Sequence, residues 1–338
     1  MRGRIAQEES LACLYSAFAL SRFSTPGILQ HLNPKDWRAH RFGLPVERWE
    51  SLRGKSFWIT GAGTGYGRCI ALALAAAGAR VFLTGRRPEK LEETRAEAVA
   101  LGVAPALCVP ITADITSPMD VQRAVEAIGQ LTSHLYGLVN NAAQPPLPGS
   151  WPLTDLDATD WNDLLATNVT GQWLVSKAAL PLMTKKDGFR IVFMTSEAGW
   201  AFTPGFGPYN LSKAAVNSLG ASLAAECAAR FPDKDAQINV LVPGEARTEM
   251  NQGSVESPFS AVCMTLALLS HPAGGPNGCF FHRDGRHLPY AYARPFARSL
   301  LASGEGAEIP ESQFKPELAG WQRRLGFERL LRLLGLRT

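Results

Sequence analysis

Long apolar runs are missing from this chain of 338 residues. A helix that spans a bilayer needs roughly 20 consecutive apolar residues, and no stretch of the sequence provides them. The apolar segment 11–20 is too short, and two glutamates precede it without a clear cleavage pattern after it. We therefore interpret this segment as a helix of the mature protein and expect a cytoplasmic location.

Patterns for metal binding, disulfides and hydrolysis are also missing. The six cysteines are scattered without a C-x-x-C pair, which indicates free thiols in a reducing compartment. The six histidines show no metal-ligand spacing, so no metal is expected, and His282 and His287 are interpreted as ordinary loop residues. No Gly-x-Ser-x-Gly turn supports a hydrolase. A net charge of +4 without a dense basic cluster argues against nucleic acid as a partner.

Short apolar segments alternate with longer helical patterns along the middle of the chain. Strands are predicted at 56–60, 80–84, 106–109, 137–140, 191–195, 237–242 and 278–281. Helices are predicted at 68–77, 88–101, 118–131, 157–184, 208–230 and 258–270. This alternation predicts a doubly wound (Rossmann) α/β fold, with a mostly parallel sheet of about seven strands and helices on both faces. The expected organisation is an N-terminal extension at 1–53, one dinucleotide-binding and catalytic domain at 54–289, and a C-terminal extension at 290–338.

A glycine-rich turn lies between the first predicted strand and the first predicted helix. The residues expected to bind a cofactor there are Thr60, Gly61, Gly63, Thr64, Gly65, Tyr66 and Gly67. Gly61 permits the tight turn, Gly65 lets the backbone approach a pyrophosphate, and Gly67 lets the helix pack closely on the strand. The phosphates would face the N-terminus of the helix, where N–H groups and the dipole favour anions. The alternative is a turn without a ligand, but the strand–turn–helix context favours a dinucleotide site.

Basic residues follow the second predicted strand, where a site for NAD usually has an acid that binds the ribose 2′-hydroxyl. Here Gly85 occupies that place, and Arg86 and Arg87 come next. An arginine pairs with a 2′-phosphate that a carboxylate would repel. The sequence therefore favours NADP, bound by Arg86, with NAD as the second choice. The alternative is that both arginines are solvated loop charges.

A tyrosine and a lysine share one face of a predicted helix, because Tyr209 and Lys213 are four residues apart. Free tyrosine has a pKa of about 10. A nearby ammonium favours the phenolate, which would bring that pKa toward neutral pH. Ser196 ends a predicted strand 13 positions before Tyr209, where its hydroxyl could donate to a substrate carbonyl. A Tyr-x-x-x-Lys pattern alone is common by chance, so it indicates a catalytic site only together with other polar residues such as Ser196.

With these motifs in this order and spacing, the chain resembles the short-chain dehydrogenase/reductase family. The resemblance covers about Gly54 to Pro289 and rests on the glycine-rich turn, Asp114, Asn140-Asn141-Ala142, Asn168, Ser196, Tyr209-x-x-x-Lys213, and Pro243-Gly244 with Thr248. It implies that Tyr209 exchanges a proton with the substrate oxygen. It also implies that Lys213 binds the nicotinamide ribose and lowers the Tyr209 pKa.

The resemblance implies roles for further residues. Ser196 would polarise the carbonyl, and Asn168 would hold a water in a proton relay to Lys213. Asp114 would contact the adenine, and Asn141 would line the cofactor. The other implied cofactor contacts are Ile115, Ala142, Tyr209, Lys213, Pro243, Gly244 and Thr248.

The implied function is an NADP-dependent oxidoreductase that moves a hydride between nicotinamide and a small-molecule carbonyl or alcohol. Two other functions stay open: a non-catalytic NADP-binding scaffold or sensor, and a nucleotide-sugar modifying enzyme of the same fold. The resemblance also implies a homodimer or homotetramer, formed through the helices that hold Asn168 and Tyr209. In the basic tail 321–338, arginines alternate with leucines. Packing on protein is the first interpretation of this tail and contact with a membrane surface the second.

The sequence departs from the family pattern near the site. Tyr66 replaces an aliphatic residue in the glycine-rich turn, and Ala143 replaces the glycine that usually follows Asn-Asn-Ala. The stretch from Thr248 to the last predicted strand is short, which reduces the usual helical lid over the substrate. The candidate substrate-binding residues mix aromatic and charged groups and are Gln144, Pro145, Glu197, Trp200, Phe202, Phe206, Glu245, Arg247 and Met250.

Overall fold

A computed structural model describes residues 40–146, 151–201 and 204–288 of the chain. Several expectations fall outside these ranges: the helix at 11–20, the C-terminal extension, the basic tail 321–338 and the candidate Phe202. Among the described residues, no helix has the length and apolarity needed to cross a membrane. The same ranges contain no cluster of three His, Cys, Asp or Glu residues that could hold a metal ion.

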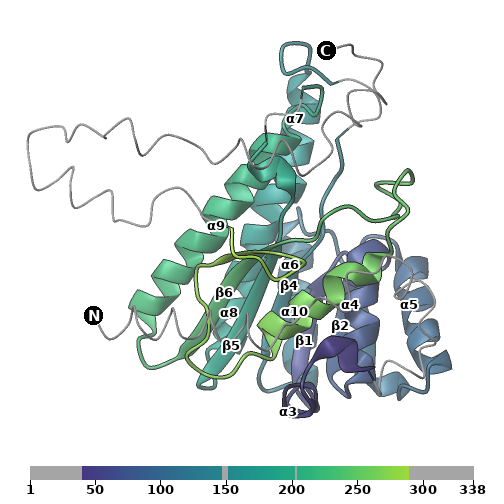
Figure 1. The fold of residues 1–338 in the computed structure, drawn as a ribbon, viewed down its shortest axis with the longest axis vertical. Coiled ribbons are helices and arrows are strands. Elements are labelled where there is room, and N and C mark those ends of the chain that lie inside the picture. Colours follow the sequence, from purple (N-terminus) through teal and green to yellow (C-terminus); the bar gives the residue numbers. More distant parts are fainter. Residues whose placement is uncertain (1–39, 147–150, 202–203, 289–338) are drawn as a thin grey trace, which may run out of the picture. The chain divides into compact units, whose positions relative to one another are not determined.

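The sheet has seven strands, all parallel, in the order β3-β2-β1-β4-β5-β6-β7 (Figure 1). The strands are β1 (Ser56–Thr60), β2 (Arg80–Gly85), β3 (Cys108–Thr112), β4 (Gly137–Asn140), β5 (Gly188–Met194), β6 (Asp235–Val242) and β7 (Phe280–His282). The strand order reverses between β1 and β4, which is the switch point where doubly wound sheets bind ligands. The predicted fold class is confirmed.

Helices cover both faces of this sheet (Figure 1). They are α3 (Val46–Glu50), α4 (Gly65–Ala76), α5 (Pro88–Ala100), α6 (Pro118–Leu131), α7 (Ala158–Leu165), α8 (Gln172–Met183), α9 (Tyr209–Arg230) and α10 (Val262–Leu269). Side chains alternate across β1: Phe57 and Ile59 join the core under α4 and α10, whereas Trp58 joins the core under α6, α8 and α9. Burial on both faces explains why the strands lack a polar side.

Several predicted elements have other bounds in the structure, and two of these differences have a local structural cause. The strand expected at 106–109 is β3 (Cys108–Thr112), because Pro105–Leu107 forms a 3-10 turn first. The helix expected at 157–184 is divided by a π-helical turn, Ala166–Gly171, between α7 and α8. The apolar pattern across 157–184 was interpreted as one continuous helix, and the extra residue of the π-helical turn was not recognised in it.

The segment before β1 shares the main core. Phe42, Leu44, Trp49 and Leu52 are all buried there, and Phe42 stacks on Phe259 with ring centroids 6.2 Å apart. No clear periodicity marked this segment, because its helical pieces, Arg41–Gly43 and α3, are too short to show one. The boundary placed after residue 53 stays a prediction, but residues 42–52 contribute to the same core as α4 and α10.

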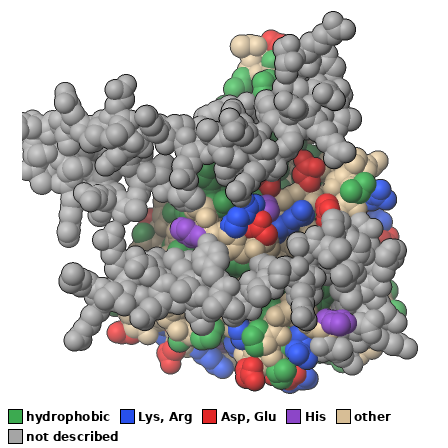
Figure 2. All heavy atoms as spheres, in the orientation of Figure 1, with side chains coloured by type: hydrophobic (Ala, Val, Ile, Leu, Met, Phe, Trp, Pro, Cys, Tyr) green, Lys and Arg blue, Asp and Glu red, His purple; other side chains and the backbone are tan. Residues whose placement is uncertain are grey.

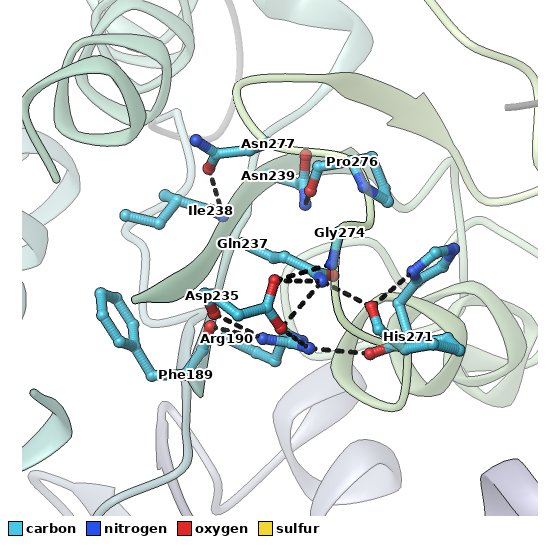
Figure 3. A network of polar contacts seen from close by, with 11 residues as sticks. Phe189, Arg190, Asp235, Gln237, Ile238, Asn239, His271, Gly274, Pro276 and Asn277 are labelled. Atoms are coloured by element: carbon cyan, nitrogen blue, oxygen red, sulfur yellow. Dashed lines mark hydrogen bonds and ion pairs between the residues drawn. The ribbon is translucent and has the colours of Figure 1, made fainter. Parts of the chain in front are cut away.

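A buried arginine connects β5, β6 and the turn after α10 (Figure 3). Arg190 is 3% exposed, and its Nη2 donates to Asp235 Oδ2 at 2.6 Å and to the His271 carbonyl at 2.8 Å. The Asp235 carboxylate also accepts hydrogen bonds from Gln237 and from the Gly274 N–H. Burial would raise the pKa of Asp235, but these hydrogen bonds and the Arg190 charge hold it below its ordinary value.

Replacing Asp235 with Asn should destabilise the fold by about 3 kcal/mol, because it leaves the buried Arg190 charge without its counter-ion. Since the folded pKa of Asp235 is depressed, this difference should be present at pH 7 and shrink as the pH falls below about 4. Urea denaturation at both pH values measures it. Asp187→Asn is the matched control, because Asp187 pairs with Lys234 while fully exposed. Equal losses in the two variants would contradict the role given to the buried pair.

Candidate active site

The predicted site residues follow the carboxyl ends of β1, β4, β5 and β6. The glycine-rich turn follows β1, Asn141 follows β4, Ser196 follows β5, and Pro243 follows β6. Parallel strands end at one edge of a sheet, so the fold brings these segments together. The site therefore forms at the switch point that the strand order defines.

Thr60 and Asn141 join two of these segments through side-chain hydrogen bonds. The Thr60 hydroxyl accepts from the N–H groups of Asn141 at 3.0 Å and Ala142 at 3.1 Å. The Asn141 amide donates in return to the carbonyls of Thr60 at 3.0 Å and Gly61 at 3.2 Å. In this structure Asn141 and Thr60 thus hold the glycine-rich turn in place.

The backbone of the glycine-rich turn requires glycine at its key positions. Gly61 and Gly65 have φ of +66° and +53°, values that other residues rarely adopt. A Cβ on Gly67 would collide with the Gly61 carbonyl oxygen. Because α4 begins at Gly65, the N–H groups of its first turn and the positive end of its dipole lie directly after this turn. These features fit the pyrophosphate of a nicotinamide dinucleotide.

Tyr66 links the glycine-rich turn to the loop after β6. Its hydroxyl donates to the Gly244 carbonyl at 2.7 Å, and burial raises its pKa. Gly244 has a φ of +68°, so this loop also needs glycine. The departure noted at Tyr66 therefore has a structural role: the phenol connects the loop expected to hold the pyrophosphate to the loop expected to hold the nicotinamide.

The arginines after β2 lie at the surface. Arg86 and Arg87 are exposed, and Arg87 forms an ion pair with Glu249 at 2.6 Å. The sequence analysis did not single out Glu249, because the pair joins segments far apart in the chain. A carboxylate on Arg87 competes with any phosphate there, so Arg86 is the better placed of the two for a 2′-phosphate.

Two further residues that are predicted to contact the cofactor, Asp114 and Ile115, follow β3. Asp114 Oδ1 accepts from the Thr116 N–H at 2.9 Å and hydroxyl at 2.8 Å, which fixes its carboxylate in the turn before α6. Ile115 is 5% exposed and packs beside Gly171. The structure does not test their contacts with adenine, which stay predictions.

Tyr209 and Lys213 are buried, and Ser196 is half-buried beside Tyr209. Tyr209 begins α9 and is 8% exposed, and a side-chain hydrogen bond joins Ser196 to its phenol. Lys213 is 2% exposed, its Nζ donates to the Met194 carbonyl at 3.2 Å, and it lies 5.5 Å from the centre of the Tyr209 ring. The structure thus brings together the three residues that the sequence selected from separate segments.

The ionisation of this group differs from the sequence expectation. Burial raises the pKa of Tyr209 to about 12, although the Ser196 hydrogen bond lowers it and the Glu197 carboxylate raises it further. Burial lowers the pKa of Lys213 to about 8. The net shift of the Tyr209 pKa is therefore upward in this structure, because burial of the phenol dominates, and the lowering by Lys213 stays a prediction. Tyr209 is a neutral phenol at pH 7 and is suited to donating a proton.

Asn168 lies within the π-helical turn and is fully buried. Its Oδ1 accepts from the Gln144 N–H at 2.6 Å, and its Nδ2 donates to the Gln144 carbonyl at 3.0 Å and to Ser212 Oγ at 3.1 Å. Asn168 thus connects the loop after β4 to α9 next to Lys213. Its role in holding a water stays a prediction.

Sequence reasoning missed a second polar group beside Ser196. His282, interpreted as a loop residue, ends β7 and lies 3.5 Å from the Glu197 carboxylate and 2.9 Å from the Asp284 carboxylate. The turn after β7 continues with Arg283, Asp284 and Arg286. Figure 2 shows acidic, basic and histidine side chains close together near the middle of one face of the molecule. A carboxylate next to Ser196 was the only signal, and Glu197 was named for it as a candidate substrate-binding residue.

Comparisons with known proteins agree with this geometry. The sequence model of the short chain dehydrogenase family matches residues 55–258. "Dehydrogenase/reductase SDR family member 4" of Rattus norvegicus is 30% identical over 226 residues, which cover 67% of this chain and 78% of that protein. "2-(S)-hydroxypropyl-CoM dehydrogenase 3" of Xanthobacter autotrophicus is 33% identical, with 66% of this chain and 84% of that protein covered.

Solved structures agree as well. A short chain dehydrogenase from Escherichia coli CFT073, in complex with NADPH, matches with a TM-score of 0.62 and 26% identity, covering 69% of this chain and 98% of that one. The chain belongs to the short chain dehydrogenase family and is an NAD(P)-dependent dehydrogenase or reductase.

Gly67→Ala should destabilise the fold by more than about 1 kcal/mol and abolish NADPH binding, because the added methyl group meets the Gly61 carbonyl. Gly129→Ala is the matched control, since Gly129 lies in α6 with open space around it and alanine there should stabilise the fold by up to about 1 kcal/mol. Urea denaturation and NADPH fluorescence titration measure the two effects. Unchanged NADPH affinity in Gly67→Ala would remove the glycine-rich turn from the cofactor site.

Proposed function

We propose that this short chain dehydrogenase transfers a hydride between NADP and the carbonyl or secondary alcohol of a small molecule, with Tyr209 as the proton donor in reduction. The observation that carries this proposal is the hydrogen bond between Ser196 and the buried Tyr209, with Lys213 Nζ 5.5 Å from the centre of the Tyr209 ring. When bound, NADPH would supply the hydride in reduction and NADP⁺ would accept it in oxidation.

Each of the three side chains, Tyr209, Ser196 and Lys213, has a separate role in proton transfer at the substrate oxygen. The Tyr209 phenol, protonated at neutral pH, donates its proton to the oxygen during reduction and takes it back during oxidation. The Ser196 hydroxyl, which is hydrogen-bonded with Tyr209, can turn its single O–H to the substrate oxygen when a substrate binds. Lys213 contributes a buried positive charge that stabilises the phenolate left behind. Asn168 keeps α9 and the loop after β4 aligned around this group.

The cofactor residues fall into three groups along the sheet edge. The glycine-rich turn and the start of α4 would hold the pyrophosphate, and Arg86 would pair with the 2′-phosphate. Asp114, Ile115 and Ala142 would line the adenosine half. Lys213 would bind the nicotinamide ribose, and Pro243, Gly244 and Thr248 would surround the nicotinamide. The NADPH complex of the Escherichia coli relative supports NADP as the first choice, with NAD as the second.

We further expect a homodimer or homotetramer in the cytoplasm. Trp173 on α8 and Leu211 on α9 are 45% and 46% exposed, and large apolar side chains on these two helices are consistent with contacts between subunits.

The choice of cofactor is tested by a thermal-shift titration with NADP and NAD. NADP should bind roughly 10- to 100-fold more tightly than NAD, and Arg86→Ala should remove that preference, since a charge-assisted hydrogen bond contributes about 1.5–3 kcal/mol. Arg123→Ala is the control, because Arg123 is equally basic and 67% exposed on α6. Equal shifts with both nucleotides in the wild type would contradict the role of Arg86.

The proton donor is tested by Tyr209→Phe. With a panel of aldehydes and ketones and NADPH, turnover of any accepted substrate should fall at least about 100-fold while NADPH still binds. Tyr136→Phe is the matched control, because Tyr136 has the same 8% exposure but precedes β4 at the opposite edge of the sheet. Unchanged turnover in Tyr209→Phe would overturn the proposed mechanism.

The direction of the reaction should depend on pH. Because the pKa of Tyr209 is raised to about 12, the phenol that reduction needs is present throughout the neutral range. The phenolate that oxidation needs becomes more abundant as the pH rises. Alcohol oxidation should therefore accelerate between pH 6 and 8, by up to about tenfold per pH unit, while reduction should not. Parallel kcat/KM profiles for the two directions would contradict this assignment.

A further inference from the structure

A carboxylate occupies the position next to the serine of the proposed catalytic group. Glu197 follows Ser196 directly and begins a short 3-10 turn, Glu197–Gly199. Its side chain is 38% exposed, and its Oε1 lies 3.5 Å from His282 Nε2. Its charge acts on the phenols of both Tyr209 and Tyr66, which places it within electrostatic reach of the reacting atoms.

We propose that Glu197 selects substrates that carry a positively charged group, and that His282 holds the Glu197 carboxylate in position for this contact. The inference rests on the proposed function, because it names the class of ketone or alcohol that reaches Ser196 and Tyr209. Glu197 would bind the substrate, and His282 would be a positioning residue.

The carboxylate is ionised at neutral pH. Burial would raise the pKa of Glu197, but hydrogen bonding to His282 and the charges of His282 and Arg283 keep it below the ordinary value. An anion at this place also raises the pKa of Tyr209, so it opposes formation of the phenolate that the reaction requires. A cation on the substrate would offset that effect while it pairs with Glu197. An anionic substrate would be repelled.

The second ring nitrogen of His282, Nδ1, faces another carboxylate, that of Asp284. Asp284 lies 2.9 Å from His282 Nδ1, and Arg286 pairs with the same carboxylate at 2.7 Å. Burial would lower the pKa of His282, but the two carboxylates raise it. This arrangement resembles the way a carboxylate orients a histidine so that its other nitrogen addresses one partner.

The positive charge of Arg283 also acts on Glu197, but its guanidinium is hydrogen-bonded to other groups. The Arg283 guanidinium donates to the Glu245 carbonyl at 2.8 Å and to Ser260 Oγ at 2.9 Å. It therefore braces the loop after Gly244, while its charge contributes to keeping Glu197 ionised. Glu245 lies on that same exposed loop and acts on Tyr66, so it supplies a second negative charge near the site.

Two aromatic side chains, Trp200 and Phe206, lie in the segment between Glu197 and α9. Phe206 is 37% exposed and meets the Tyr209 ring edge-on, with ring centroids 6.3 Å apart. Trp200, which follows the Glu197 turn, packs edge-on against Phe280 at 5.9 Å. Aromatic faces near a carboxylate are the groups that recognise quaternary ammonium ions. This composition favours a cation over a neutral polar group as the partner of Glu197.

Three cyclohexanones test the proposal, substituted at position 4 with trimethylammonium, tert-butyl or carboxylate. The first two have the same shape and differ only in charge. Dissociation constants for the NADP⁺-loaded enzyme, which cannot reduce the ketones, should increase in that order when measured by calorimetry. The cation should bind at least about tenfold more tightly than its neutral counterpart. Reduction of the same ketones, followed by NADPH absorbance, gives kcat/KM as the second measurement.

Two variants assign this preference to Glu197. Glu197→Gln should bring the trimethylammonium and tert-butyl ketones to within about twofold of each other. Glu245→Gln removes a nearby exposed charge and should preserve most of the preference. If Glu197→Gln instead changes the ratio of NADP⁺ to NADPH affinity and leaves the ketone order intact, Glu197 acts on the cofactor and the proposal is overturned.

The role of His282 is tested by pH. Protonated His282 neutralises Glu197, so the preference for the trimethylammonium ketone should grow as the pH rises and His282 loses its proton. Asp284, Arg286 and Arg283 keep their charges through this range, and so does the quaternary ammonium group. In His282→Gln the preference should become independent of pH between 6 and 7, below the range in which Lys213, with a pKa of about 8, loses its charge. An unchanged pH profile in this variant would exclude His282 from the contact.

Two further outcomes are decisive. Equal or tighter binding of the carboxylate ketone, or no binding of the cationic ketone at millimolar concentration, overturns the proposal. If the expected order of affinities is found but no ketone is reduced or alcohol oxidised, the proposed redox function fails while the charge preference of Glu197 stands.

Discussion

The reciprocal hydrogen bonding of Thr60 and Asn141 is the contact on which the rest of the site depends. It joins the turns after β1 and β4 at the point where the strand order reverses. Because Asn141 also holds the Gly61 carbonyl, the glycine-rich turn is fixed before any ligand arrives. Tyr66 extends this connection to the loop after β6 through Gly244. Three segments that are distant in sequence thus form one prearranged surface, which reduces the ordering cost of binding a flexible dinucleotide.

Burial sets the chemistry of the proposed catalytic group. A phenol and an ammonium enclosed by protein both favour their neutral forms, which is why the pKa of Tyr209 is raised and that of Lys213 is lowered. The enclosed phenol is consequently a weak acid that keeps its proton at neutral pH, and its phenolate is a strong base. Hydrogen bonding to Ser196 and the nearby ammonium then determine how readily that proton moves.

The sequence predicted what depends on local pattern and missed what depends on distant pairing. Apolar strands, the turn from Thr60 to Gly67 and the spacing of Ser196, Tyr209 and Lys213 carry their signal within a few residues, so the sheet and the catalytic group could be predicted. The Glu249–Arg87 and His282–Glu197 pairs join segments far apart in the chain, and only the folded structure brings them together. The direction of the Tyr209 pKa was also beyond reach, because it depends on burial.

The π-helical turn at Asn168 restricts how this chain can change during evolution. Asn168 reaches Gln144 and Ser212 only because one turn, Ala166–Gly171, accommodates an additional residue. Removing one residue would restore an ordinary helix and rotate the side chains of α7 by about 100° relative to α8. Substitutions on either helix can be tolerated one at a time, whereas a change in length between them cannot. Insertions and deletions in this family member should therefore accumulate in the surface loops, and the segment from α7 to α8 should keep its residue count even where its sequence drifts.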